Sequence, residues 1–257
     1  NLTMLDHADT LNSLKLVARN AGVAIMEIYQ QDAGTETKAD GSPVTLADKA
    51  AEAIILPALK AVDSGITIIS EESAESHLLE APERFFIVDP LDGTKEFLKK
   101  DGLGSFTVNI ALVENNEPVL GVVYAPALDR LFYGSSNLGA FEEKAGKTQS
   151  IRIRNTPETG EVAVASISHR DEQTDNWLNE NEIHQTTSIG SSLKFCLIAC
   201  GEADVYPRFG PTMEWDTAAG DAVLRAAGGM VIQPNQKPFI YGKVHYRNGP
   251  FIARGNV

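Results

Sequence analysis

The chain has 257 residues, of which 43% are hydrophobic and 22% are charged, as in ordinary soluble globular proteins with one large domain or two modest ones. Its net charge of −13 disfavours nucleic-acid duplexes and anionic membranes as general partners, because both bind through basic patches. No apolar run approaches the roughly 18 residues that cross a membrane, and the N-terminal stretch lacks the basic and apolar regions of a signal peptide, so we expect a cytoplasmic protein.

Two helices are predicted at the start of the chain. Apolar residues recur with a helical period from about Asp9 to Tyr29. After a turn-rich break, a second helix is predicted to begin after Thr45 and to end near Val62, with Asp48 in its first turns. The first half of the chain is therefore expected to open with helical structure.

Strand-forming segments follow these helices. The run GITIIS ends at Glu71, with Glu72 beside it, and the run RFFIV ends at Asp89. Both runs deliver acidic side chains at strand ends, where open α/β sheets tend to place ligand sites. Residues 105–126 predict two strands around a turn, and residues 130–135 predict a third strand.

The polar segment 148–161 is the expected boundary between two subdomains, residues 1–155 and 156–257. Beyond this segment, short apolar runs that predict strands alternate with periodic runs that predict helices. A mixed α/β protein built from layers, with two subdomains, fits both halves of the chain.

The two cysteines, Cys196 and Cys200, lie four residues apart in a predicted helix. Two cysteines at this spacing do not make a disulfide framework, so a reducing compartment is expected. A metal or redox role would need further cysteines or nearby histidines, and the sequence offers none at a convincing spacing. We interpret the pair as small core residues on one helix face.

Several carboxylates stand at the ends of predicted elements: Asp48, Glu71, Glu72, Asp89, Asp92 and Asp216. Burying them together without cations would cost several kcal/mol for each uncompensated charge. Hard divalent cations such as Mg²⁺ take oxygen ligands and would remove that cost. The acidic pattern therefore predicts a divalent-metal site.

The segment DPLDGT, residues 89–94, has the features of a metal-binding loop. Its two aspartates flank a predicted turn, so their side chains can converge, and its proline leaves the carbonyl of Leu91 free to act as a ligand. Its glycine permits a sharp turn, and Thr94 can cap a helix that begins near Lys95. The first amides of that helix would point at an anion such as phosphate. A simple Asp-Gly turn is the alternative interpretation.

Spacing separates this segment from two other acidic motifs. An EF-hand loop has acidic residues at alternating positions, and Leu91 breaks that alternation. A haloacid-dehalogenase phosphatase has a nucleophilic aspartate two residues before its second aspartate, where this chain has Pro90. The spacing therefore favours metal ligation without a covalent intermediate.

Several blocks carry a resemblance to a known family. The segment DPLDGT, together with SEES upstream and WDTAAGDAVL downstream, resembles the signatures of the inositol monophosphatase superfamily of lithium-sensitive, Mg²⁺-dependent phosphatases. The longer blocks GSSLKFC and YPRFGPT resemble its branch of CysQ-type 3'(2'),5'-bisphosphate nucleotidases. This resemblance implies a layered α-β-α-β-α sugar-phosphatase-like fold. It also implies an N-terminal subdomain with most of the metal ligands and a C-terminal subdomain that completes the metal site and binds the nucleotide.

The same resemblance implies roles for the acidic residues. Two to three Mg²⁺ ions would be held by Glu71, Asp89, the Leu91 carbonyl, Asp92 and Asp216. Asp48 and Thr94 would orient and deprotonate the attacking water, while the metals neutralise the phosphoryl charge. The role of Glu72 stays open between the metal site and solvent. Asp221, five residues after Asp216 on a predicted helix, is expected to face away and lie at the surface.

Polar and cationic residues are candidates for substrate binding. The set expected to contact substrate is Asp92, Gly93, Thr94, Lys95, Ser168, His169, Ser191, Lys194, Arg208 and Asp216. Ser191 and Lys194 are three residues apart at a predicted helix start, so they are expected to share a face. With Arg208 as a bidentate clamp, they could grip a 5'-phosphate. A solvated lysine and a packing or surface histidine are the alternative interpretations of Lys194 and His169.

The resemblance implies hydrolysis of the 3'-phosphate of adenosine 3',5'-bisphosphate to AMP and phosphate, and action on its sulfated parent, 3'-phosphoadenylyl sulfate. An inositol or sugar monophosphatase of the same superfamily is the alternative, and a non-catalytic binding protein is a second one. Some family members are peripheral on the inner face of the cytoplasmic membrane, but no basic amphipathic helix here explains such binding. The expected partner is a small nucleotide rather than a nucleic acid.

Overall fold

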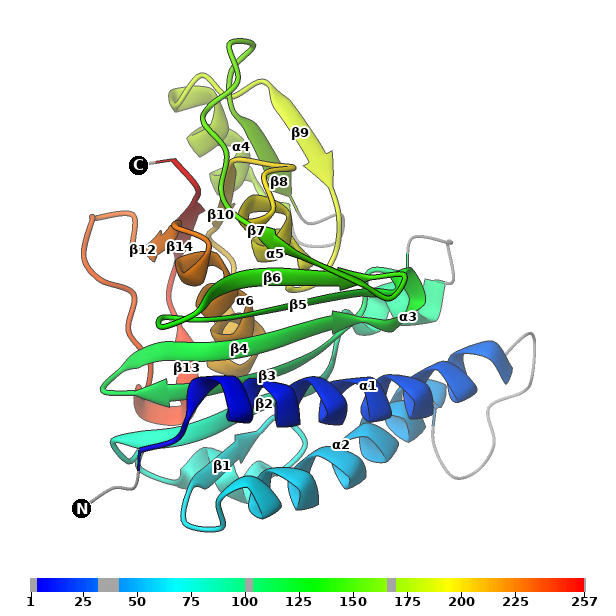
Figure 1. Ribbon diagram of the computed structural model, residues 1–257. Coiled ribbons are helices and arrows are strands. Elements are labelled where there is room, and N and C mark those ends of the chain that lie inside the picture. The colour runs from blue at the N-terminus through cyan, green and yellow to red at the C-terminus, as the bar shows by residue number, and fades with distance from the viewer. Residues whose placement is uncertain (1–3, 32–41, 100–103, 166–169, 257) are drawn as a thin grey trace.

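The protein is built from five layers in a computed structural model that describes residues 4–31, 42–99, 104–165 and 170–256. Two long helices cover one face of a large sheet, and two further helices lie between this sheet and a smaller second sheet (Figure 1). A last helix packs on the outer face of the second sheet. The expected α-β-α-β-α order is therefore confirmed.

The large sheet has seven strands among the described residues, in the order β1-β2-β3-β4-β5-β6-β7. β1 and β2 are parallel, and the other neighbours are antiparallel. The strands are Thr67–Ser70 (β1), Arg84–Asp92 (β2), Thr107–Glu114 (β3), Glu117–Ala125 (β4), Arg130–Ser135 (β5), Gly139–Lys144 (β6) and Lys147–Ile151 (β7).

The smaller sheet has the order β12-β14-β10-β8-β9. Its strands are Val162–Ala165 (β8), Gln185–Ser188 (β9), Val205–Arg208 (β10), Met230–Ile232 (β12) and Phe251–Arg254 (β14), and a separate pair joins Thr212–Met213 (β11) to Arg247–Asn248 (β13). The α-helices are His7–Gln31 (α1), Pro43–Val62 (α2), Thr94–Lys99 (α3), Glu172–Glu180 (α4), Leu193–Ala199 (α5) and Glu214–Ala226 (α6). Short 3-10 turns occupy Ala74–Leu78, Pro126–Leu128 and Val244–Tyr246.

Each layer contact has its own apolar core. The amphipathic faces of α1 and α2 pack on one face of the large sheet, with fully buried residues such as Leu14, Ile55 and Val108. The opposite face meets α5 and α6, and there Gly121 of β4 allows a close approach, because a Cβ at this position would lie 3.0 Å from the Cα of Ala219 in α6. Helix α6, from the second half of the chain, therefore covers the sheet built by the first half.

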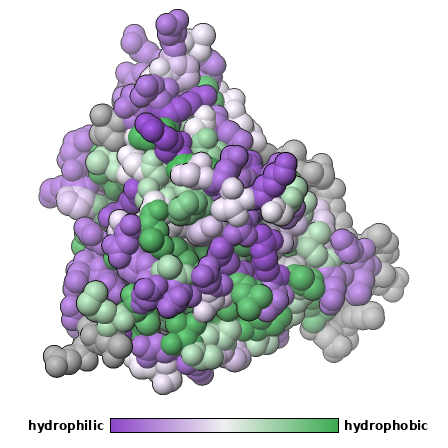
Figure 2. Space-filling model, viewed as in Figure 1, coloured by the Kyte–Doolittle hydropathy of each residue, from purple (hydrophilic) through white to green (hydrophobic). Residues whose placement is uncertain are grey.

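On the face seen in Figure 2, hydrophilic residues cover the upper part, and hydrophobic residues gather in the lower part over α1 and α2. Leu16 and Val23 of α1 are 62% and 60% exposed. No helix in the described ranges has the length and apolar character needed to cross a membrane.

Several sequence-based boundaries shift in the structure. The second helix begins at Pro43 instead of after Thr45, because Ser42 caps it by accepting a hydrogen bond from the Thr45 N–H, and proline suits a first helical position. The polar segment 148–161 begins inside β7, whose exposed side chains hid its strand character. The division at residue 155 falls between β7 and β8 and stays a prediction.

Asp221 is the clearest error of the sequence analysis, which placed it at the surface. Its side chain is fully buried, and it accepts hydrogen bonds from the Arg225 guanidinium and the Tyr241 hydroxyl, both at 2.7 Å. Burial raises the pKa of this carboxyl, and Arg225 opposes the rise. The face of α6 opposite Asp216 is thus also interior, since layers cover the helix on both sides.

We expect Asp221→Ala to lower the free energy of unfolding by about 2 to 4 kcal/mol, because it removes the carboxylate that pairs with Arg225 and accepts from the buried Tyr241 hydroxyl, leaving these donors only the Phe239 carbonyl and the Thr217 hydroxyl. Urea unfolding followed by circular dichroism measures this loss. Asp175→Ala is the matched control, because Asp175 pairs with Arg170 in an exposed ion pair, where a change below about 1 kcal/mol is expected. Equal effects of the two variants would contradict a structural role for Asp221.

Candidate active site

The C-terminal end of strand β2 carries two aspartates whose side chains lie on the same side of the strand. In a regular strand, residues three apart point to opposite faces. Here Asp89 pairs with Asn109 and Asp92 with Thr107, and the register shifts between them. This irregularity, which contains Pro90, lets both carboxylates face one point. The expected convergence is thus present, although it comes from a bulged strand rather than from a turn.

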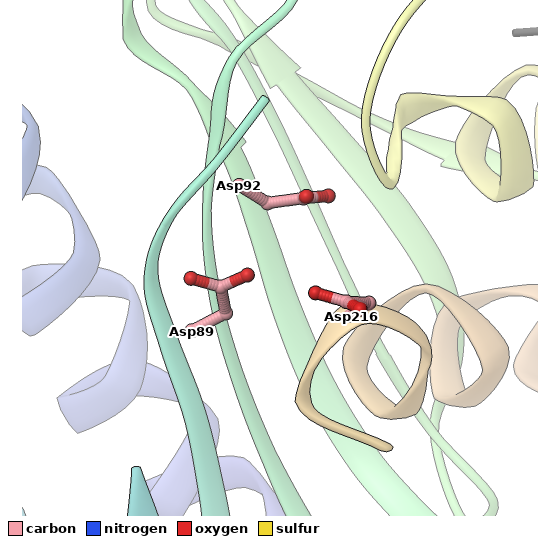
Figure 3. A group of neighbouring side chains, drawn as sticks. All are labelled: Asp89, Asp92 and Asp216. Carbon is pink, nitrogen blue, oxygen red and sulfur yellow. The ribbon is translucent and has the colours of Figure 1, made fainter. Parts of the chain in front are cut away.

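A third aspartate joins them from the other half of the chain. Asp216 lies in the first turn of α6, where its Oδ2 accepts a hydrogen bond from the Met213 N–H at 2.8 Å. Figure 3 shows the side chains of Asp89, Asp92 and Asp216 pointing toward one another. One carboxylate oxygen from each lies within 4.8 Å of the others. Among the described residues, this group has the geometry of a cation site.

Backbone donors hold the two aspartates of β2. The Leu91 N–H donates to Asp89 Oδ1 at 3.2 Å, and the Ser192 N–H donates to Asp92 Oδ2 at 2.8 Å. Leu91 itself is buried and, like Pro90, has no partner in the β2–β3 register. Its carbonyl therefore stays a predicted metal ligand.

Further carboxylates approach the same cluster. Glu71 follows β1, and its N–H donates to the Val88 carbonyl at 3.1 Å, which sets Glu71 beside Asp89. Asp48 of α2 is buried, and its Oδ1 has no hydrogen-bond partner. Glu72, whose role the sequence left open, is directed toward Asp48, since its charge acts on that carboxyl.

The carboxyls share one electrostatic environment. Burial raises the pKa of Asp92 to about 8, and the charge of Asp216 adds to the rise. Asp216 itself is raised to about 6, again mainly by burial. Burial also raises the pKa of Asp89, with Glu71 as the main charge, and raises that of Asp48 to about 8, with Glu72 as the main charge. Without a cation, these groups therefore hold protons more tightly than free carboxyls do.

The donor set suits divalent metal ions. Carboxylate oxygens are hard ligands, and they converge here without a lysine or arginine ion pair to neutralise them among the described residues. One carboxylate is buried and two are half-buried, so a bound cation would offset a repulsion that the protein does not offset itself. The residues thus fit a metal site of the kind expected from the sequence.

A cavity of about 290 Å³ adjoins this cluster. Predicted residues line it: Asp92, Gly93, Thr94, Lys95, Ser191, Lys194, Arg208 and Asp216. Lys194 is 3% exposed, with its ammonium 5.1 Å from the Tyr206 ring centre, and burial lowers its pKa to about 8. Arg208 is 9% exposed and donates to the carbonyls of Gly210 and Pro211. Neither cation has an ion pair among the described residues.

Some predicted residues reach the cavity by a different route. Ser191 does not share a helix face with Lys194, because α5 begins only at Leu193. Ser191 instead has a φ of 61° and donates its hydroxyl to the Ser105 carbonyl. Thr94 is the first residue of α3 rather than its cap. No hydrogen bond joins Thr94 to Asp48 in the described structure, so their shared role stays a prediction.

The structure adds residues that the sequence analysis missed. Ser192, Glu96, Phe195, Tyr206, Pro211, Thr212 and Thr217 also line the cavity. Ser192 and Tyr206 lie inside the blocks GSSLKFC and YPRFGPT, so the resemblance of these blocks to the family could have indicated both residues. Ser168 and His169 fall outside the described residues. Cys196 is buried and Cys200 half-buried, both as free thiols, as expected.

The model of the inositol monophosphatase family matches residues 6–253. The chain belongs to the inositol monophosphatase family. The acidic cluster of this family member is therefore a metal-site candidate on two independent grounds, its geometry and its family.

Similar proteins include named nucleotidases. The 3'(2'),5'-bisphosphate nucleotidase CysQ of Escherichia coli K12 is 45% identical over 237 residues, which cover 90% of this chain and 93% of that protein. The crystal structure of CysQ from Bacteroides thetaiotaomicron is 36% identical with a TM-score of 0.85, covering 98% of this chain and 99% of that one. An inositol monophosphatase from Anabaena is 26% identical with a TM-score of 0.75, covering 98% and 92%.

The raised carboxyl pKa values predict how stability depends on pH. For Asp92 and Asp48, the folded state binds protons more tightly than the unfolded state between about pH 4 and pH 8. The free energy of unfolding of the metal-free protein should therefore fall as pH rises from 5 to 8, by at least about 1 kcal/mol. Lys194 changes this pH dependence of stability only above about pH 8, because burial lowers its pKa in the folded protein to about 8. Urea unfolding with a chelator present measures this slope.

Mg²⁺ should stabilise the protein more at pH 8 than at pH 5, because protons compete for the same oxygens. Asp92→Asn is the matched control, since it keeps the side-chain shape and should flatten the slope. A metal-free protein that becomes more stable between pH 5 and pH 8 would contradict the clustered-carboxylate interpretation.

Proposed function

We propose that the protein is a 3'(2'),5'-bisphosphate nucleotidase that hydrolyses the 3'-phosphate of adenosine 3',5'-bisphosphate, giving AMP and phosphate. One observation carries the proposal: a single cavity is lined by Asp92 and Asp216 of the carboxylate cluster and by two buried cations, Lys194 and Arg208, which form no ion pair among the described residues. Such a cavity suits an anion with two separate phosphates. The nucleotidases named above support the same activity.

The protein's own residues divide into two groups. Glu71, Asp89, the Leu91 carbonyl, Asp92 and Asp216 would hold two to three Mg²⁺ ions. When bound, these ions would neutralise the phosphoryl oxygens and acidify water.

Asp48 would take the proton of the attacking water, and the Thr94 hydroxyl would orient that water. The new bond forms between the water oxygen and phosphorus, and the bond from phosphorus to the ribose 3'-oxygen breaks. That oxygen takes a proton from solvent water, and Asp48 returns to solvent the proton that it took. Because phosphoryl transfer depends mainly on positioning and charge neutralisation, no covalent intermediate is needed.

The second phosphate would bind at the part of the cavity that Lys194 and Arg208 line. Arg208 can supply a bidentate fork and Lys194 a point charge, both desolvated by burial. Ser191, Gly93 and Lys95 would add polar contacts around the nucleotide, together with Ser168 and His169. The sulfated parent, 3'-phosphoadenylyl sulfate, offers the same arrangement of charge. A small nucleotide substrate makes the cytoplasm the compartment that we propose, with peripheral binding to the inner membrane face as an alternative.

An inositol or sugar monophosphatase is the alternative function, favoured by the family itself and by the similarity to the Anabaena inositol monophosphatase. A monophosphate would leave either the carboxylate cluster or the pair Lys194 and Arg208 without a phosphate to bind. The two functions therefore differ in how much a second phosphate on the substrate raises kcat/KM.

Phosphate release from a panel of substrates separates these functions. With Mg²⁺, adenosine 3',5'-bisphosphate should be cleaved with a kcat/KM at least about 100-fold above that for inositol 1-phosphate, because only the former has a second phosphate for Lys194 and Arg208 to bind. Activity should vanish with a chelator and in Asp92→Asn. Faster cleavage of inositol 1-phosphate would establish the alternative, and turnover of Asp92→Asn at saturating Mg²⁺ would remove Asp92 from the metal site.

Lys194→Ala should raise KM for the bisphosphate by about 10- to 100-fold, because it removes a charge-assisted contact to the second phosphate. The KM for p-nitrophenyl phosphate, which lacks that phosphate, should change by less than about threefold. Lys144→Ala, a change on the exposed end of β6, is the control for loss of one positive charge. Equal increases of KM for both substrates would remove Lys194 from the second phosphate site.

A further inference from the structure

Glu96 is a carboxylate on the wall of the substrate cavity to which the proposed chemistry gives no role. It belongs to α3, is only 6% exposed, and lines the cavity together with Lys194 and Arg208. An anionic group in a cavity for a polyanion is unfavourable unless it has a function of its own. Its position therefore calls for a specific partner.

Two glycines leave the space that this carboxylate fills. A Cβ on Gly190 would overlap the Glu96 carboxylate and would lie 2.6 Å from its Cγ. A Cβ on Gly93, where φ is +90°, would lie 3.2 Å from Glu96 Oε2. The backbone thus approaches Glu96 from both halves of the chain, and a larger residue at position 190 would displace the carboxylate.

No described group satisfies the Glu96 oxygens. The other carboxylates around the cavity accept backbone hydrogen bonds, as Asp92 does from Ser192 and Asp216 does from Met213. For Glu96, the described residues provide no hydrogen bond or ion pair, and Lys194 acts on it only as a neighbouring charge. Because Glu96 is 6% exposed and lines the cavity, a ligand in the cavity can supply the donor that its oxygens lack among the described residues.

The location of Glu96 selects the kind of donor. Phosphate oxygens would be repelled by the carboxylate, whereas sugar hydroxyls can donate to it. Glu96 Oε2 lies against Gly93, which stands between Asp92 of the metal cluster and Thr94 of the catalytic pair. The carboxylate is therefore beside the position of the cleaved ester, where the substrate presents the neighbouring hydroxyl.

We propose that Glu96 is a specificity-determining residue that accepts a hydrogen bond from the ribose 2'-hydroxyl beside the cleaved 3'-phosphate. This role rests on the proposed nucleotidase function. It selects ribonucleotides with a free 2'-hydroxyl, and it disfavours a second anionic group at that position. Gly190 is a positioning residue for the same contact, because it leaves room for the carboxylate.

The experiment compares adenosine 3',5'-bisphosphate with its 2'-deoxy analogue, which lacks only the hydroxyl. Wild-type protein should prefer the ribonucleotide in kcat/KM by about 10- to 100-fold, the usual value of a hydrogen bond to a charged group. Glu96→Ala should lose this preference by lowering kcat/KM for the ribonucleotide alone. Glu96→Gln keeps one acceptor oxygen, so its preference for the ribonucleotide should lie between those of the wild type and Glu96→Ala. A loss of equal size on both substrates would overturn the proposal.

Gly190→Ala provides an independent test that leaves Glu96 in place. It should reduce the preference for the ribonucleotide in the same direction, because the added methyl group displaces the carboxylate. Glu172→Ala, at the exposed start of α4, is the control for loss of one negative charge and should keep the full preference. Thermal unfolding of each variant shows whether it is folded. A Gly190→Ala protein that is folded and keeps the full preference would also overturn the proposal.

The two proposals fail in different ways. Wild-type protein that cleaves neither bisphosphate, yet cleaves inositol 1-phosphate, would refute the nucleotidase function and with it this role of Glu96. Wild-type protein that cleaves both bisphosphates equally well would leave the nucleotidase function intact and refute only the hydroxyl contact.

Discussion

The repulsion among convergent carboxylates is the constraint around which the site is built. Asp89, Asp92 and Asp216 bring oxygens within 4.8 Å of one another, and each has a raised pKa for which burial is the main cause. Each of the three accepts a hydrogen bond from one backbone N–H, and none forms an ion pair with a lysine or arginine among the described residues. A pocket that holds like charges together with neutral donors is prepared for cations that come from outside the chain.

This arrangement requires the two halves of the chain to pack closely. Asp89 and Asp92 lie on β2, whereas Asp216 and the N–H of Ser192 come from segments beyond residue 155. The helix that carries Asp216 packs on the large sheet, against Gly121, where any Cβ would meet the α6 backbone. The acidic cluster thus forms only when α6 is seated on the sheet, so folding and site assembly are one event.

The sequence indicated both the acidic cluster and the layered α/β fold, and it missed details of each. Paired acidic residues after apolar runs indicated the metal cluster, because strand ends are a local property. Asp221 was misplaced because its burial depends on Tyr241 and on a second layer above α6, which no local pattern reports. Strand β7 was missed because its outward side chains are polar. The position of Glu96 in the cavity wall was not predicted, because the space for its carboxylate is left by Gly190, which is distant in the sequence.

Charge balance explains why an acidic protein can bind a polyanion. In the described part of the chain, Lys194 and Arg208 are buried without ion pairs, and the neighbouring carboxylate cluster offsets their charge at a distance. Divalent cations on the cluster would cancel that compensation and leave both side chains as free positive charges in a desolvated cavity. Under the proposed function, the cavity would then favour an anion that contacts both the metals and these two side chains. Anion recognition would thus depend on metal binding, and the net charge of −13 would not oppose it.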